Sequence, residues 1–234
     1  MKRETKCLAL SGPAGLALIL LAAPAAHAEP IAPTATHDGV VGQVLVNPHG
    51  DTDGLVLKDG AVVRFPPHAV LAVGQLVAGT NVHVEGESLG PSGTVRLFDA
   101  RVSTAGRVVV DPSLAPAPPR RPRPPGGPDG DLAAMTASGR VRLVLTNPDG
   151  VADGLVLEDG TVIHAGPRSR LARTGVVAGS VVNVSGVGGS YPGGRSLEAR
   201  TLQLDSGPVY DLDRGPGRPA PQAPPAAPAA PPVP

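Results

Sequence analysis

A duplication constrains the fold of this chain more than any other feature of its sequence. The stretch NPHGDTDGLVLKDG, from Asn47 to Gly60, returns one hundred residues later as NPDGVADGLVLEDG, from Asn147 to Gly160. Over positions 41–86, 23 of 46 residues are identical to the residue one hundred positions later. The chain therefore predicts two copies of one fold, at 36–106 and 137–206. At about 70 residues, each copy is long enough for a small core of its own.

Each copy consists of short β-forming runs separated by turn sequences. The first copy predicts strands at 40–46, 54–57, 61–65, 81–85 and 94–102, with a short helix within 69–77. The second predicts the same elements at 141–145, 154–157, 161–164, 181–185 and 196–204, with its helix within 169–177. Five strands with a helix before the fourth are the order of the OB-fold, a small Greek-key barrel. The predicted fold class is all-β, two tandem five-stranded OB-like barrels with one short helix each. An SH3-like barrel without the helix is the alternative.

The repeated stretch supplies the turns of each copy. Asn-Pro-x-Gly follows the first strand, and Asp-Gly closes the next hairpin, because glycine adopts a positive φ at little cost. The predicted turn residues are Asn47, Pro48, Gly50, Asp59 and Gly60, with their counterparts Asn147, Pro148, Gly150, Asp159 and Gly160.

The run NPHGDTDGLVLKDGAVVRFPPH of the first copy resembles a family of small, largely uncharacterised bacterial proteins with an OB-like domain. The shared order is a strand, an Asn-Pro-x-Gly turn, a D-G-L-x-L strand, a D-G hairpin and an F-P-P-H end. The second copy departs at its end, where Ala165-Gly166-Pro167-Arg168 replaces Phe65-Pro66-Pro67-His68. The resemblance covers both copies and implies a fold, but no activity.

The N-terminal residues predict export. Lys2, Arg3 and Lys6 precede an apolar run from Ala14 to Ala23, and Ala26-His27-Ala28 provides a cleavage site. This pattern is typical of a signal peptide over residues 1–28, and the apolar run is too short to span a membrane. The expected location is periplasmic or extracellular, with no transmembrane segment after cleavage. The only cysteine, Cys7, lies in this leader, so the exported chain has no thiol or disulfide.

Two segments are rich in proline. The linker at 107–136 contains DPSLAPAPPRRPRPPGGPDGD, and the tail at 207–234 ends in APQAPPAAPAAPPVP. Neither has an apolar period that builds a core, so both are expected to be disordered and extended, with polyproline II character.

Charge and composition argue against nucleic acid as a partner. Loss of Lys2, Arg3, Lys6 and Glu4 from 20 basic and 20 acidic residues leaves 17 and 19. The exported chain has only two phenylalanines and two tyrosines and no tryptophan. Binding of single strands normally needs a positive groove and aromatic stacking surfaces.

The first copy holds the residues that best suit a metal, namely His49, Asp51, Asp53 and His68. Histidine and carboxylate are common metal ligands. The calcium-loop pattern is incomplete, however, and the second copy has Asp149, Val151 and Arg168 at three of these positions. Side-chain hydrogen bonds that hold local turns are the alternative explanation.

The sequence contains no G-x-S-x-G, H-E-x-x-H or phosphate-loop motif. We therefore expect a protein that is not an enzyme and needs no cofactor. The predicted function is an exported binding or scaffold protein of the bacterial cell envelope, with an unidentified envelope protein or polymer as its partner. The alternatives are metal or small-ligand binding by the first copy, and single-stranded nucleic-acid binding by analogy with other OB-folds.

Overall fold

The computed structural model describes residues 34–72, 74–88, 95–114, 132–166 and 169–212. All of them belong to one compact unit that starts at Ala32. The predicted leader, most of the linker and most of the tail lie outside the described residues.

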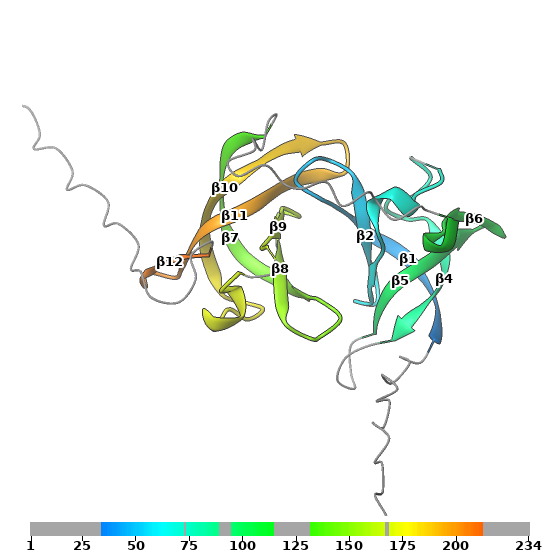
Figure 1. Ribbon diagram of the computed structural model, residues 1–234, viewed down its shortest axis with the longest axis horizontal. Coiled ribbons are helices and arrows are strands. Elements are labelled where there is room, and N and C mark those ends of the chain that lie inside the picture. Colours follow the sequence, from blue (N-terminus) through cyan, green and yellow to red (C-terminus); the bar gives the residue numbers. More distant parts are fainter. Residues whose placement is uncertain (1–33, 73, 89–94, 115–131, 167–168, 213–234) are drawn as a thin grey trace, which may run out of the picture. The chain divides into compact units, whose positions relative to one another are not determined.

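The first repeat is a closed β-barrel (Figure 1). Its strands are β1 (Thr34–Val46), β2 (Thr52–Leu57), β3 (Val62–Arg64), β4 (Asn81–Ser88) and β5 (Arg96–Thr104). The long strand β1 pairs with β4 through residues 34–40 and with β2 through residues 41–46. Strand β5 pairs with β4 and, in parallel, with β3, which closes the barrel.

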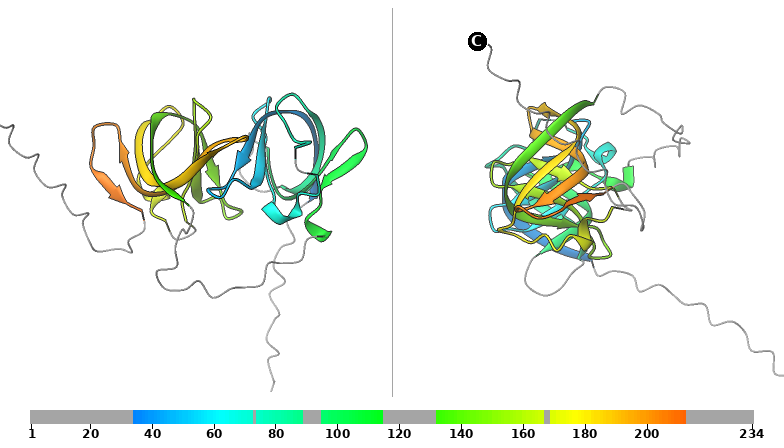
Figure 2. Two further views of the ribbon diagram at one scale, coloured as in Figure 1. Left: turned by 90° about the horizontal axis from the view of Figure 1, so that it is seen from above. Right: turned by 90° about the vertical axis from the view of Figure 1, so that its left-hand side faces the viewer.

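The second repeat closes in the same way, and Figure 2 shows the strands of each repeat curving around its interior. Its strands are β7 (Ala133–Thr146), β8 (Ala152–Leu157), β9 (Val162–His164), β10 (Val181–Tyr191) and β11 (Gly194–Leu204). Strand β7 pairs with β8 and β10, and β11 pairs with β10 and with β9 in parallel. The prediction of an all-β chain with two tandem five-stranded barrels is confirmed.

Both barrels extend beyond the predicted boundaries. Strand β6 (Arg107–Val110) pairs with β5, and a 3-10 turn η2 (Pro112–Leu114) follows it, so repeat 1 continues into the segment predicted as linker. Strand β7 also begins at Ala133, inside that segment, and β12 (Val209–Asp211) pairs with β11 inside the predicted tail. Val109, Val110 and Leu212 are buried, which explains why these residues join the folded part.

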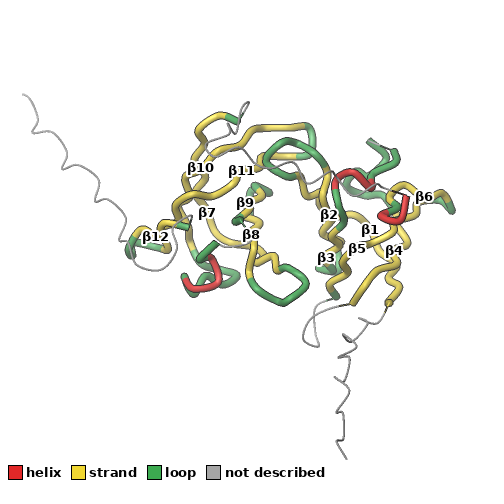
Figure 3. The backbone as a smooth tube through the Cα atoms, in the orientation of Figure 1, coloured by secondary structure: helices red, strands yellow, loops and turns green. Residues whose placement is uncertain are grey.

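The predicted short helices are single 3-10 turns, and in repeat 1 the turn lies at the start of the predicted range and before it. Figure 3 marks only brief helical turns (red) among the strands (yellow), and they are the 3-10 turns η1 (Pro67–Ala69), η2 and η3 (Leu171–Arg173). In repeat 1 the turn starts at Pro67, and Gly74 has a φ of +86°, which an α-helix cannot contain. In repeat 2, Gly175 has a φ of +74° directly after the turn.

Each barrel has its own apolar core. In repeat 1 the core includes Val41, Leu55, Val63, Val84 and Leu97, and strand β6 adds Val109 and Val110. The core of repeat 2 uses the equivalent positions and closes with Leu212. A separate cluster, described below, joins the outer faces of the two barrels.

Candidate functional site

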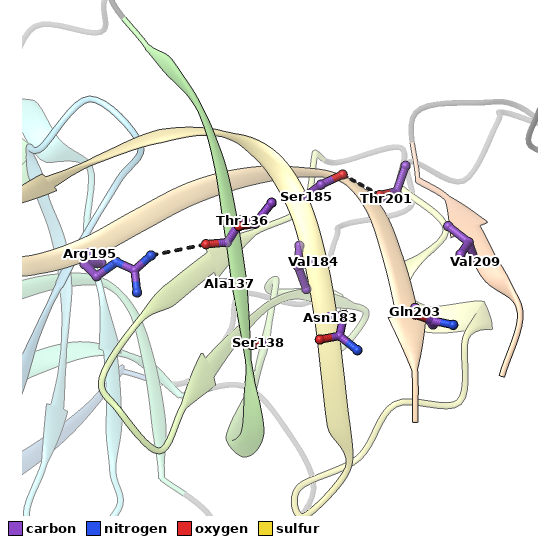
Figure 4. Close-up of a pocket in the computed structure, with 10 residues that line it drawn as sticks. All are labelled: Thr136, Ala137, Ser138, Asn183, Val184, Ser185, Arg195, Thr201, Gln203 and Val209. Carbon is purple, nitrogen blue, oxygen red and sulfur yellow. Dashed lines mark hydrogen bonds between the residues drawn. The ribbon is translucent and has the colours of Figure 1, made fainter. Parts of the chain in front are cut away.

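Exposed and half-buried hydrogen-bonding side chains of repeat 2 line a depression on the outside of its barrel (Figure 4). We call it the polar depression. It has a volume of about 460 Å³. Strands β7, β10, β11 and β12 supply its lining, which comprises Thr136, Ala137, Ser138, Asn183, Val184, Ser185, Arg195, Thr201, Gln203 and Val209.

Strand register explains why these side chains gather. Ser138, Asn183 and Gln203 lie opposite one another on three neighbouring strands, so they form a row across the barrel. Inward-facing Val182 and Val184 alternate with outward-facing Asn183 along β10. The hydroxyls of Ser185 and Thr201 are 2.6 Å apart, and an Arg195 guanidinium nitrogen donates to the Thr136 carbonyl over 3.2 Å.

Repeat 1 has a depression of about 580 Å³ at the same place, but its row is Asp38, His83 and Ser103. His83 Nδ1 donates to Asp38 Oδ1 over 2.7 Å, and Glu85 Oε1 lies 3.5 Å from Nε2. The hydrogen bond and charge of Asp38, with a smaller contribution from Glu85, raise the pKa of His83. The two copies therefore present depressions at corresponding places with different rows, uncharged in repeat 2 and titratable in repeat 1.

A second feature is the contact between the repeats, which we call the repeat interface. Its apolar part consists of the same three positions from each repeat, Leu45, Val56 and Val62 with Leu145, Val156 and Val162. Matching positions on both sides are the mark of a two-fold contact between equal surfaces. The two repeats thus bury their equivalent outer faces against each other.

Hydrogen bonds cross the repeat interface at its edges. The Gln43 amide donates to the Gly160 carbonyl over 2.7 Å, and Tyr191 donates its hydroxyl to the Pro48 carbonyl. The Tyr191 ring also packs on Gly50, where a Cβ would come within 2.5 Å of the ring. Glycine is required there both by this contact and by a φ of +89°.

A charged cluster lies within the repeat interface and comprises Asp53, Arg64, Asp153 and His164. Arg64 Nη2 is 3.5 Å from Asp53 Oδ2, and His164 Nδ1 is 3.9 Å from the same oxygen. Asp53 Oδ1 and Asp153 Oδ1 are buried and have no hydrogen-bond partner. Burial raises the pKa of Asp153, against the opposing charges of Arg64 and His164.

The predicted metal candidates do not come together. His49 donates its backbone amide to Asn47 Oδ1, Asp51 Oδ2 accepts from the Asn47 side chain, and Asp53 faces Arg64. His68 is an exposed residue of the turn η1. Within the described parts of the chain, no group of three His, Cys, Asp or Glu side chains is close enough to hold a metal ion.

The predicted turn residues do form turns. Asn47 Oδ1 accepts the amides of His49 and Asp51, and Gly50 donates its amide to the Asn47 carbonyl. In the hairpin, the Asp59 carboxylate accepts the Ala61 amide over 3.0 Å, and Gly60 has a φ of +92°. In the second copy Asn147 Oδ1 accepts the Val151 amide, Gly150 donates to the Asn147 carbonyl and Asp159 accepts the Thr161 amide. Gly160 has a φ of +86°.

The repeat interface also covers the surface on which an OB-fold would bind nucleic acid. OB-folds bind oligonucleotides on the face of their second and third strands. Here Val56 on β2 and Val62 on β3, and their counterparts on β8 and β9, lie in the repeat interface. The face that the analogy invokes is therefore covered in both copies.

Of the residues of the two rows and of the charged cluster, the sequence pointed only to Asp53 and to His83, both as candidate metal ligands of the first copy. A signal for the rows existed in the alternation of β4, where every second residue from Asn81 to Glu87 is polar, and in that of β10 at Asn183 and Ser185. The comparisons with known proteins add no residue assignments, because no protein-family model and no curated protein matches this chain. In the part of the chain that the structure describes, no helix has the length and apolar character needed to cross a membrane.

Proposed function

We propose that this chain is an exported binding protein of the bacterial cell envelope, without enzymatic activity, and that it binds a hydroxyl-rich envelope polymer in the polar depression of repeat 2. The observation that carries the proposal is the row of Ser138, Asn183 and Gln203, which presents uncharged donors and acceptors across three strands. Amide and hydroxyl side chains both donate and accept, as the hydroxyls of a polysaccharide do.

The surroundings of the row support a polar ligand. Thr136, Ser185 and Thr201 add further hydroxyls, and Arg195 provides one positive charge at the end of the depression. A volume of about 460 Å³ suits one or two sugar units of a longer chain, since small-molecule sites span about 300–1,000 Å³. The signal-peptide pattern and the resemblance to small bacterial OB-like domains support the location.

A titration of the purified chain with a short N-acetylglucosamine oligomer, followed by amide NMR shifts, tests this proposal. This probe carries hydroxyl and amide groups and no charge. We expect shifts confined to residues of the polar depression, and we expect Asn183→Ala to weaken binding roughly threefold to tenfold, as for one lost hydrogen bond.

The matched control is Gln75→Ala, which removes an exposed amide outside the polar depression. It should bind as the unsubstituted chain does. Shifts spread over other surfaces, or equal affinities for the Asn183 and Gln75 variants, would contradict the proposed site.

A further inference from the structure

The charged cluster in the repeat interface is built from the same two positions of each repeat. Asp53 is the second residue of strand β2, and Asp153 is the second residue of strand β8. Position 64 is an arginine in repeat 1, whereas position 164 is a histidine in repeat 2. Arginine keeps its charge at every physiological pH, and histidine does not. The two copies therefore place one side chain of fixed charge, Arg64, and one that can gain or lose a proton, His164, beside the two aspartates.

The hydrogen bond of His164 determines which ring nitrogen carries a proton in the neutral state. Nε2 lies 2.9 Å from the carbonyl oxygen of Val46 in the other repeat. A carbonyl oxygen can only accept, so Nε2 must be the donor. In neutral His164 the unprotonated nitrogen is then Nδ1, and this atom faces Asp53 Oδ2 at 3.9 Å. A lone pair and a carboxylate repel each other.

Protonation reverses the sign of this contact. With a hydrogen on Nδ1, His164 becomes a cation that binds the Val46 carbonyl through Nε2 and faces the Asp53 carboxylate through Nδ1. Both groups belong to repeat 1, and the side chains of His164 and Asp53 are only 15% and 9% exposed. Water therefore screens the new attraction weakly.

The charge balance of the cluster points the same way. Asp53 and Asp153 face Arg64 and His164, and Asp99 lines the same small cavity of about 160 Å³ beside Arg64 and Asp153. With His164 neutral, Arg64 is the sole cation facing these carboxylates among the described residues.

We propose that uptake of a proton by His164 clamps the two repeats together, so that the repeat interface is tighter under mildly acidic than under alkaline conditions. The clamp determines how rigidly the depression of repeat 1 is held relative to the depression of repeat 2. It does not depend on what either depression binds.

Tyr191 provides an intrinsic reporter for the clamp, because its ring packs on Gly50 and its hydroxyl binds the Pro48 carbonyl across the repeat interface. The chain has only one other tyrosine, Tyr210, and no tryptophan. In a Tyr210→Phe background, acrylamide quenching of fluorescence then reports on Tyr191 alone. We expect quenching to fall by roughly twofold or more from about pH 8 to pH 5, the range in which histidines change charge.

Two variants of His164 separate charge from fold. His164→Gln is neutral at every pH and should show strong quenching throughout, whereas His164→Arg carries the fixed charge of the repeat 1 position and should show weak quenching throughout. His49→Asn, next to the Pro48 carbonyl, is the control and should keep the full pH dependence. Quenching that is independent of pH in the Tyr210→Phe background, or that keeps its pH dependence in His164→Gln, would overturn the proposal. Loss of the dependence in His49→Asn would overturn it as well.

Discussion

At the scale of single residues, a substitution at Gly60 would lower stability through the backbone conformation alone. Its φ is +92°, and a Cβ built there would meet no atom within 4 Å. Gly60→Val should therefore lower the free energy of unfolding by about 1–3 kcal/mol through strain and not through a clash. Urea denaturation measures this loss. Lys58→Val in the same loop is the control, because no positive φ is required there. An equal loss in both variants would assign the effect to β-branching.

Asp59 gives a pH-dependent prediction at the same scale. The hydrogen bond from the Ala61 amide, together with the hydrogen bond and charge of His37, lowers the pKa of Asp59 from its usual 3.8. A carboxylate with a lowered pKa stabilises the fold above its unfolded-state pKa, and this contribution is lost as the pH falls through the folded value. Asp59→Asn should thus reduce stability at neutral pH and flatten the acid limb of the stability curve, as measured by urea denaturation.

His37→Ala is the comparison for this effect, because it removes the side-chain partner of Asp59 and leaves the Ala61 amide in place. We expect His37→Ala to flatten the acid limb less than Asp59→Asn. An acid limb that His37→Ala leaves unchanged would show that His37 does not contribute.

At the scale of the elements, strand β6 adds to repeat 1 a part that lies outside the predicted boundary. Val109 is fully buried in the repeat 1 core. Val109→Ala should cost about 2 kcal/mol in the free energy of unfolding, from the lost burial of its methyl groups and the cavity that remains. Val95→Ala, at a position that is 40% exposed, should cost much less. Equal and small losses in thermal or urea unfolding would place β6 outside the cooperative fold.

The secondary structure could be predicted from the sequence only in part. Barrel strands and their hairpins were predictable because the local signals, such as Asp59-Gly60 between two apolar runs, decide them. The position of the helical turn in repeat 1 was not predictable, because AVLAVGQLV has helix-forming residues whereas the turn ends at Ala69 and Gly74 takes a positive φ. Strand β6 was missed because RVVV is followed directly by proline-rich sequence, and only its partner β5 shows that the run is paired.

At the scale of the whole molecule, the sequence did carry one sign of the repeat interface. A strand with one face in water alternates apolar and polar residues, but Leu55, Val56 and Leu57 are apolar in succession and all buried. Leu155, Val156 and Leu157 repeat the pattern. Such runs indicate a strand covered on both faces, but they cannot say what covers it. The charged cluster could not be predicted, because Arg64 and His164 meet the two aspartates only after both barrels have folded.

The repeat interface should make the two barrels unfold as one. Val56 lies in the shared cluster and not in the core of repeat 1, so Val56→Asp leaves each barrel its own core. A buried charge without a partner is strongly unfavourable, and separation of the repeats relieves it. Calorimetry should therefore show one transition for the unsubstituted chain and two for Val56→Asp. Val151→Asp is the control, because it introduces on an exposed loop the aspartate that repeat 1 has at the matching position 51. This variant should keep the single transition. Two transitions in the unsubstituted chain would mean that the interface does not couple the barrels, whereas a single lowered transition in Val56→Asp would mean that neither barrel is stable without the other.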